Sequence, residues 1–220
     1  MKNLKKLATA IAVYTILSSS VYAMDNVVAL GPKIGTQGFG LEARSPLMDN
    51  LFGRVGINYA KFSTTKKDCK LTDKIKLTLF TVPIMLDWYP INNSGFRLSA
   101  GVSYNDNKVT RLTKATKSTT FNGTSYSPDQ TRTIKFTLGN KIAPIVTLGY
   151  DSSILNETSW SFNCEAGIMF GNIKIDARTT GAVTDKVKAY IKKDAATIEK
   201  DLRKKYPFYP IISLGFKYNF

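Results

Sequence analysis

The chain has 220 residues, of which 31 are Lys or Arg and 16 are Asp or Glu, so its formal net charge is +15. It contains no histidine. That excludes the hydrolases that use an imidazole as general base, because imidazole alone titrates near neutral pH unaided.

Residues 1–23 have the pattern of a secretory signal peptide. Three lysines precede the apolar run Leu7–Leu17, which is shorter than the about 20 residues that a membrane-spanning helix needs. That length disfavours the alternative of an N-terminal membrane anchor, and Met24 in place of a cysteine disfavours a lipoprotein. The expected mature domain, 24–220, keeps 28 basic and 16 acidic residues, a net charge of +12. In an exported protein this balance favours anionic lipid surfaces over nucleic acid.

Seven runs of alternating apolar and polar residues follow, and alternation of period two predicts strands with two unlike faces. In chain order they are residues 33–44, 54–62, 75–90, 96–107, 134–150, 160–170 and 208–220. In the third run the phase slips at Leu79-Phe80, which predicts a β-bulge.

The connections alternate between short and long. "SPLMDN", "INNSG" and "ILNETS" are short, whereas residues 63–74, 113–131 and 179–206 form long connections. The last of these changes to helical periodicity, with Val187, Tyr190, Ile191, Ile198 and Leu202 on one stripe. This connection predicts a charged α-helix at about residues 183–205, before the last strand. The side of the membrane on which the helix lies stays open.

The charge distribution favours an all-β, antiparallel transmembrane barrel over a soluble sandwich. The apolar faces are broad and almost free of charge, and Phe52, Trp88, Tyr89, Phe96, Tyr150 and Trp160 flank the short turns as an expected interfacial girdle. The polar faces carry charges that we expect to point into a narrow lumen and pair there as an ionic network: Glu42, Arg44, Arg54, Asp87, Arg97, Lys135, Glu165 and Lys217.

A barrel of eight strands needs one strand more than the seven runs supply, because single-chain bacterial barrels have an even number. The eighth strand is either near residues 26–32, or it arises from a hairpin at Gly171-Asn172. Whether Cys69 and Cys164 form a disulfide also stays open.

The last strand resembles the C-terminal assembly signal of bacterial outer-membrane barrels. The residues that carry this resemblance are Phe208, Leu214, Phe216, Tyr218 and Phe220. The blocks "KIGTQGFGLEA", "LDWYPINNSGFRLSAGVSYNDN" and "FYPIISLGFKYNF" resemble a family of small, largely uncharacterised outer-membrane proteins and, more distantly, OmpA-type and OmpW-type eight-stranded barrels. The resemblance implies an integral outer-membrane location, assembly by the barrel-insertion machinery and contact with outer-membrane lipid, including lipopolysaccharide.

The sequence indicates no enzyme, catalytic residue, cofactor or metal site. The glycines near Gly35 lack the Lys-Ser pair of a phosphate loop, and the two separated cysteines make a poor metal site. Two functions remain. The favoured one is a structural or surface-interaction barrel with a plugged, ion-paired lumen. The alternative is a narrow pore that weakly prefers anions, because basic residues exceed acidic ones on the lumen face.

Overall fold

The computed structural model describes residues 29–67, 71–92, 94–115, 119–121, 124–126, 131–154, 159–180, 196–200 and 208–220. The expected signal peptide and Cys69 lie outside these residues. No helix within the described ranges has the length and the apolar composition that crossing a membrane requires.

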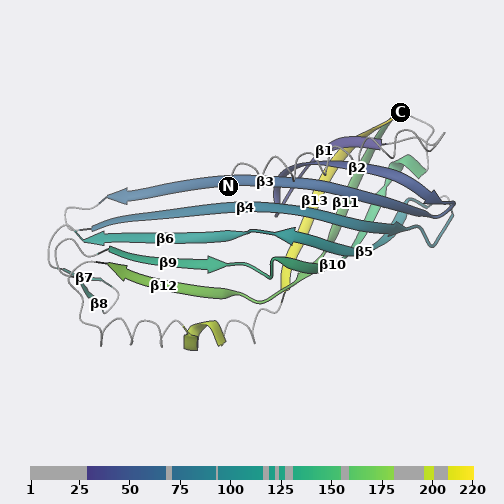
Figure 1. Ribbon diagram of the computed structural model, residues 1–220. Helices are drawn as coiled ribbons and strands as arrows, with labels where there is room; N and C mark the ends of the chain where they lie inside the picture. The colour runs from purple at the N-terminus through teal and green to yellow at the C-terminus, as the bar shows by residue number, and fades with distance from the viewer. Residues whose placement is uncertain are drawn as a thin grey trace, which may run out of the picture.

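Eight antiparallel strands close into a barrel, which confirms the predicted fold (Figure 1). Around the wall the order is β4, β3, β2, β1, β13, β11, β10 and β5, and pairing of β5 with β4 closes the ring. The strands are β1 (Ala29–Gly35), β2 (Gly38–Met48), β3 (Leu51–Lys67), β4 (Leu71–Trp88), β5 (Phe96–Asn105), β10 (Ile142–Asp151), β11 (Trp160–Phe170) and β13 (Phe208–Asn219).

The eighth strand is β1, close to the first of the two sequence alternatives. Residues 33–44, expected as a single strand, turn at Thr36-Gln37 into the β1–β2 hairpin. The other alternative, a hairpin at Gly171-Asn172, is a wrong prediction, because β12 (Lys174–Thr180) pairs with β9 and not with β11.

The two rims of the barrel differ. At one rim the described chain ends meet, since Ala29 pairs with Asn219, and the β2–β3, β4–β5 and β10–β11 turns lie there. The last of these turns includes a 3₁₀ helix, Ser152–Ile154. We call this the short-turn rim and the opposite one the extension rim.

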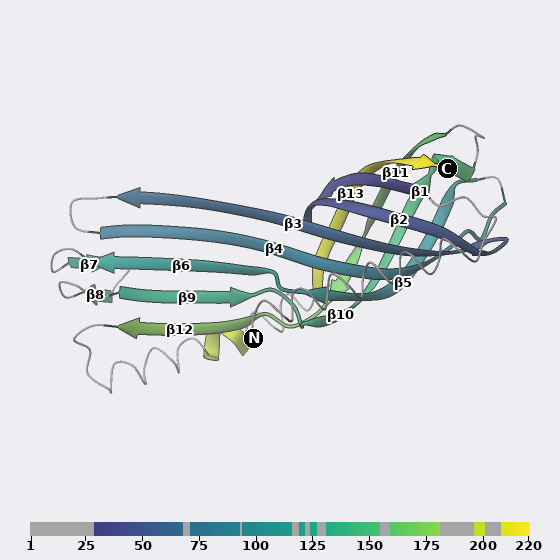
Figure 2. The ribbon, with the colours of Figure 1, turned by 45° about the horizontal axis from the view of Figure 1, so that its top comes forward.

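A sheet extends beyond the barrel at the extension rim (Figure 2). Strands β3 and β4 have 17 and 18 residues, more than the about 9–11 that cross a membrane. Their far halves pair with β6 (Lys108–Ala115), β9 (Thr131–Thr137) and β12, in the order β3, β4, β6, β9, β12. A small pair, β7 (Thr119–Phe121) and β8 (Thr124–Tyr126), follows β6. We call the five-stranded sheet the extension; much of it was expected as long loops.

Two asparagines fasten the extension to the barrel. The side chain of Asn105 donates to the carbonyl oxygens of Leu138 and Asn140 at 2.6 and 3.1 Å. Asn107 Oδ1 accepts a hydrogen bond from the backbone N–H of Phe80 at 2.8 Å. Both asparagines are fully buried. They supply hydrogen-bond partners to the carbonyl groups between β9 and β10 and to the N–H of β4 that lies opposite the junction of β5 and β6.

The phase slip at Leu79-Phe80 is not a β-bulge, and that prediction is wrong. Strands β3 and β4 keep one register throughout, from Lys67 opposite Thr72 to Leu51 opposite Trp88. What changes is the environment of the two faces. In the barrel the apolar residues point outward, whereas in the extension Leu77 and Leu79 lie on the inward side, and Lys76 lies on the outward side.

Residues 196–200 are helical and lie beside the edge of the extension, where Glu199 Oε2 accepts a hydrogen bond from the backbone N–H of Ile175 at 2.9 Å. The remainder of the expected helix at about 183–205 lies outside the described residues. Its full extent therefore stays a prediction.

Candidate functional site

The barrel interior is the most highly charged buried region that the structure describes. Residues with inward parity on the barrel strands are almost fully buried, while their neighbours in sequence are exposed on the outer wall. The interior holds five cationic and four anionic side chains: Lys33, Arg44, Arg54, Arg97, Lys217, Glu42, Asp87, Asp151 and Glu165. Buried charges of this kind are costly unless paired, so their contacts decide what the interior can do.

Arg54 is the hub of the pairing. Its Nη1 lies 2.7 Å from Glu42 Oε2, its Nε 2.8 Å from Asp87 Oδ2 and its Nη2 3.0 Å from Glu165 Oε2. One guanidinium thus binds three carboxylates, which its planar array of five N–H donors permits. Lys33 Nζ adds a second cation at 3.1 Å from Glu42 and 3.5 Å from Glu165.

Arg97 and Lys217 connect this hub to Asp151. Arg97 lies 3.3 Å from both Asp151 Oδ2 and Glu165 Oε2, and 3.8 Å from Asp87 Oδ2. Lys217 Nζ lies 2.7 Å from Asp151 Oδ2 and 3.4 Å from Glu42 Oε1. Each of the four carboxylates therefore meets at least two cations, and the pairs join into one continuous network.

Gly149 makes room for Arg97 within this network. A Cβ atom at position 149 would lie 2.8 Å from Arg97 Nε and 2.9 Å from the carbonyl oxygen of Cys164. The absence of a side chain at position 149 thus leaves room for Arg97, the largest fully buried side chain that the structure describes.

Arg44 closes the network at the short-turn rim. Its Nη1 donates to Asp151 Oδ2 at 2.7 Å and to the hydroxyl of Tyr89 at 2.6 Å, and its Nη2 donates to Ser153 Oγ at 2.9 Å. The guanidinium also lies 4.4 Å from the centroid of the Phe52 ring. Tyr89 was expected in the outer girdle, but it is buried inside the rim, because its hydroxyl finds Arg44 there.

An apolar layer lies beside the ionic network, toward the extension rim. It comprises Met85, Ala143, Ile145, Met169 and Ile211, against which Tyr209 packs. Met85 Sδ lies 3.5 Å from Arg54 Nη2, so the two layers are in contact. An apolar constriction disfavours a continuous water column.

Lys135 does not belong to the interior, so the prediction that it takes part in the lumen network is wrong. It lies exposed on the outward face of β9, in the extension. The reason is that residues 138–141 lead from β9 into β10, with Gly139 at φ 86°. The apolar alternation keeps its phase across this segment, so the sequence shows one strand where the structure has two.

Three further interior residues were not expected from the sequence: Lys33, Tyr89 and Asp151. Asp151 follows the inward residues Thr147 and Gly149 at the same spacing, so continued alternation could have identified it. Lys33 lies two residues before Gly35 on the inward face of β1, a strand that the sequence did not separate from β2.

The residues of the expected assembly signal lie on the outer wall of β13. Phe208, Leu214, Phe216 and Phe220 are about half exposed or more, and Tyr218 less so. Tyr218 packs edge to face against Trp160 and Phe220, with ring centroids 5.3 and 5.0 Å apart. These aromatic side chains lie at the short-turn rim.

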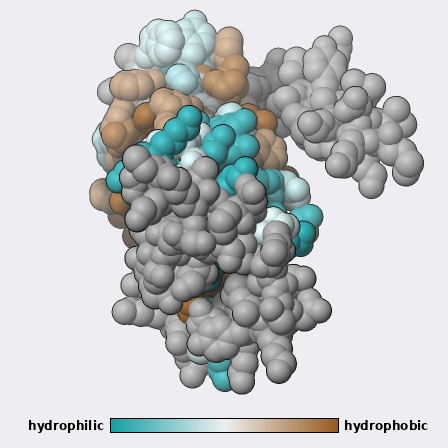
Figure 3. All heavy atoms as spheres, turned by 90° about the vertical axis from the view of Figure 1, so that its left-hand side faces the viewer, coloured by the Kyte–Doolittle hydropathy of each residue, from teal (hydrophilic) through white to brown (hydrophobic). Residues whose placement is uncertain are grey.

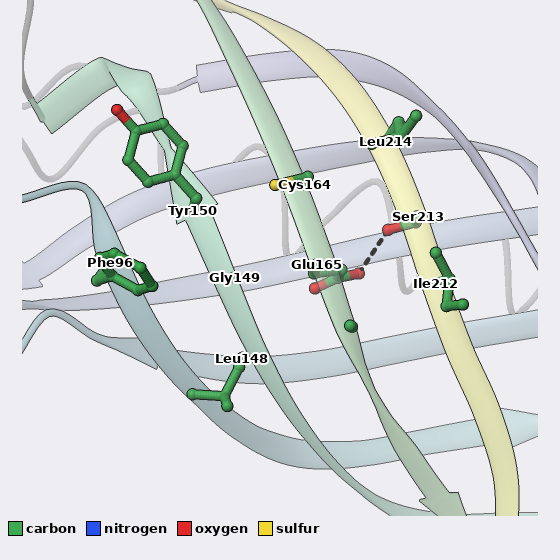
Figure 4. Close-up of a pocket in the computed structure, with 10 residues that line it drawn as sticks. Phe96, Leu148, Gly149, Tyr150, Cys164, Glu165, Ile212, Ser213 and Leu214 are labelled. Atoms are coloured by element: carbon green, nitrogen blue, oxygen red, sulfur yellow. Dashed lines mark hydrogen bonds between the residues drawn. The ribbon is translucent and has the colours of Figure 1, made fainter.

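The outer wall has a shallow depression between β5, β10, β11 and β13 (Figure 4). Large apolar side chains such as Leu148 and Leu214 surround the smaller Cys164, a free thiol on the described part of the chain. On the same strands, Ser213 Oγ donates to Glu165 Oε1 at 2.9 Å. Figure 4 therefore includes residues of both faces of the wall: Glu165 and Ser213 of the interior, and apolar residues such as Leu148 and Leu214 of the exterior.

Among the described residues no three Cys, Asp or Glu side chains gather as metal ligands. The charged side chains of the interior instead neutralise one another, since every carboxylate is bound by cations from other strands.

Comparison with known proteins shows the fold. No protein-family model and no curated protein matches the sequence. The solved structure of CarO2 from Acinetobacter baumannii is similar with a TM-score of 0.59 and 16% identity, over 88% of this chain and 98% of that one. CarO from Acinetobacter baumannii is similar with a TM-score of 0.58 and 21% identity, over 87% and 97%.

The fold and these neighbours define the class as a small, eight-stranded β-barrel of the bacterial outer-membrane type. The eight-stranded barrel that the sequence resemblance implied is thereby confirmed. At such low identity the similarity concerns the fold.

Proposed function

We propose that the chain is an integral outer-membrane protein whose closed barrel anchors the extension and presents it at the cell surface. The observation that carries this proposal is the occupied interior, in which nine charged side chains neutralise one another beside an apolar layer. A lumen filled in this way serves as a plug, because eight strands enclose little more than the volume of their own side chains.

The placement in the membrane follows from the two rims. Outer-membrane barrels have short periplasmic turns and longer extracellular connections. The short-turn rim, with both described chain ends, would then face the periplasm and the extension would face outward. Residues 1–23 would act as the cleaved signal peptide, and the exposed aromatic residues of β13 would be read by the barrel-insertion machinery.

The role is structural or interactive and not enzymatic in this proposal. The carboxylates of the interior are already bound by cations, and a carboxylate that is neutralised in this way is a weaker base and nucleophile. Outer-membrane lipid, with lipopolysaccharide in the outer leaflet, is the expected surrounding. The charged helix near residues 183–205 would lie outside the bilayer, since its charges forbid a lipid-exposed path.

A narrow, weakly anion-selective pore is the second candidate. The described interior has one more cation than carboxylates, and Arg97 Nε, Ser99 Oγ and Ser161 Oγ have no protein hydrogen-bond partner. Such groups bind water readily. A pore predicts steady conductance, whereas the plugged barrel predicts almost none.

Cysteine labelling in intact cells tests the placement, in a background with Cys69→Ser and Cys164→Ser. A membrane-impermeant maleimide should label Lys74→Cys, on the extension, but not Asp49→Cys, in the β2–β3 turn. Both residues are exposed, so the difference reports the side of the membrane. Labelling of Asp49→Cys alone, or recovery of the protein in the soluble periplasm, would overturn the proposal.

A further inference from the structure

On the outward face of the extension, cationic side chains alternate with side chains that mostly carry a hydroxyl group. Its residues align across β3, β4, β6, β9 and β12, which lie side by side in Figure 2. We call it the basic face, and its four rows, from the barrel outward, are Lys61-Thr78-Lys108-Thr137-Lys174, Ser63-Lys76-Thr110-Lys135-Asp176, Thr65-Lys74-Leu112-Thr133-Arg178 and Lys67-Thr72-Lys114-Thr131-Thr180.

The charge of this face is far from balanced. Nine of its residues are Lys or Arg and one, Asp176, is acidic. Asp176 is bound by Arg178 at 2.9 Å, and Lys108 meets Asp106 at 2.6 Å beside the first row. Soluble surfaces ordinarily intersperse both signs. Here no two cations are direct cross-strand neighbours, an arrangement that limits the repulsion between them, and the excess positive charge favours an anionic ligand.

The other residues of the basic face narrow the ligand class. None of its twenty side chains is aromatic, and Leu112 is the only apolar residue among them. The unstacked bases of single-stranded nucleic acid are bound on aromatic side chains, and the hot spots of protein interfaces are enriched in buried Trp and Tyr. A ligand with several anionic groups and exposed hydroxyls fits better. From strand and residue spacings, the cations spread over roughly 20 Å in each direction.

The basic face continues directly from the lipid-facing wall. On β3 the outward residues Ile57 and Tyr59 are exposed on the barrel, and Lys61 follows at the next outward position, about 7 Å further along the strand. Aromatic residues such as Tyr59 mark the membrane interface in barrels. The first basic row therefore lies at the depth where the headgroups of the surrounding leaflet begin. Seen from the end that carries the extension, hydrophilic side chains lie next to the hydrophobic wall (Figure 3).

We propose that the basic face binds the phosphate groups of the phosphorylated glycolipid that surrounds the barrel in the outer leaflet. Lysines and the threonine hydroxyls between them supply charge and hydrogen bonds to the phosphate oxygens. This inference rests on the proposed outward placement of the extension, and it names the partner of that surface.

Binding of lipid A to the purified protein tests the inference. The protein is folded in zwitterionic detergent and titrated with fluorescent bis-phosphorylated lipid A, and in parallel with lipid A from which both phosphates have been removed. Each lysine near an anionic surface adds about fivefold to affinity, so Lys76→Gln with Lys135→Gln should weaken binding about 30-fold. Binding should also weaken with rising salt.

The matched control removes two charges that lie off the basic face. Lys66 is exposed at inward parity on β3, and Lys141 is exposed in the segment between β9 and β10. Lys66→Gln with Lys141→Gln should therefore leave the affinity nearly unchanged. Equal loss in both pairs of variants, or equal binding of the dephosphorylated lipid, would overturn the inference. Tight binding of dextran sulfate without binding of lipid A would also overturn it, and would assign the face to a free polyanion.

The lipid A titration and the labelling experiment can give opposite results, so the proposed ligand and the proposed placement are tested separately. A periplasmic extension would still bind lipid A in detergent, but Lys74→Cys would then escape labelling in intact cells. Labelling of Lys74→Cys without binding of lipid A would support the placement and contradict the proposed ligand.

Discussion

Replacement of Arg54 by Met should destabilise the barrel strongly, because one carboxylate would lose its only close cation. Glu42 and Glu165 would each keep Lys33 and a second cation. Asp87 would keep only Arg97, 3.8 Å away, although it is 0% exposed. Removing one partner of a buried ion pair costs about 3–5 kcal/mol, which lowers the folding equilibrium constant at least about a hundredfold.

Urea unfolding of the protein in lipid vesicles or detergent measures this loss. With an m value of about 2 kcal/mol/M, a loss of about 3 kcal/mol lowers the midpoint by roughly 1.5 M. Adding Asp87→Asn to Arg54→Met should restore much of the stability, since no charge is then stranded. The control is Arg111→Met, which removes an arginine 2.8 Å from Asp73 on the partly exposed extension and should cost about 1 kcal/mol or less. Equal midpoints for Arg54→Met and Arg111→Met would refute the buried network and indicate a hydrated lumen.

Three further perturbations test other parts of the molecule. Phe220→Ala should slow barrel assembly in cells and in vitro, seen as delayed heat-modifiable migration; unchanged yield and rate would count against the assembly signal. Asn105→Ala should expose two buried carbonyl groups at a cost of about 1–3 kcal/mol and speed hydrogen exchange where the extension joins the barrel, whereas exchange as slow as in the parent would rule out the fastening role. The hydrogen bond from Arg111 lowers the pKa of Asp73, so its contribution is present above the ordinary carboxyl pKa and is lost as pH falls through the lowered value. Protection of β4 and β6 from hydrogen exchange should therefore fall in acid, and Asp73→Asn should remove that pH dependence; an unchanged dependence would assign it to another group.

The barrel itself could be predicted because lipid and lumen impose one simple rule on every strand. Apolar residues point outward and polar ones inward, so alternation identifies the strands, and the terminal Phe220 agrees with the assembly motif of the class. Glu42, Arg54 and Glu165 are recognisable for the same reason, since a charge on the polar face of such a strand has few other places to go.

The extension could not be predicted because there the rule reverses. In the extension the outward face is polar, and the apolar residues Leu77 and Leu79 of β4 have inward parity. An exchange of the apolar and polar faces within one strand therefore has the same sequence pattern as a β-bulge. Lys135 was misplaced for a related reason. Odd-numbered residues point outward on β9 but inward on β10, whereas most apolar residues stay at even positions on both strands.

The sequence also could not predict which charged side chains of the interior contact one another. Alternation gives the face of a residue but not its height in the barrel or the strand opposite it. The contact of Lys217 with Asp151, for example, joins residues 66 apart in the chain. It depends on the closed ring and on its register, which the sequence alone did not supply.

Single-channel recording of the purified wild-type barrel in planar bilayers tests the plugged interior most directly. Nine mutually paired charges beside an apolar layer predict little or no conductance at any moderate voltage. Arg97→Glu should then open a leak or destabilise the barrel, because it removes a cation and adds a carboxylate beside Asp151 and Glu165. Large, steady wild-type conductance with anion preference, little altered by Arg97→Glu, would contradict the plug and establish the pore.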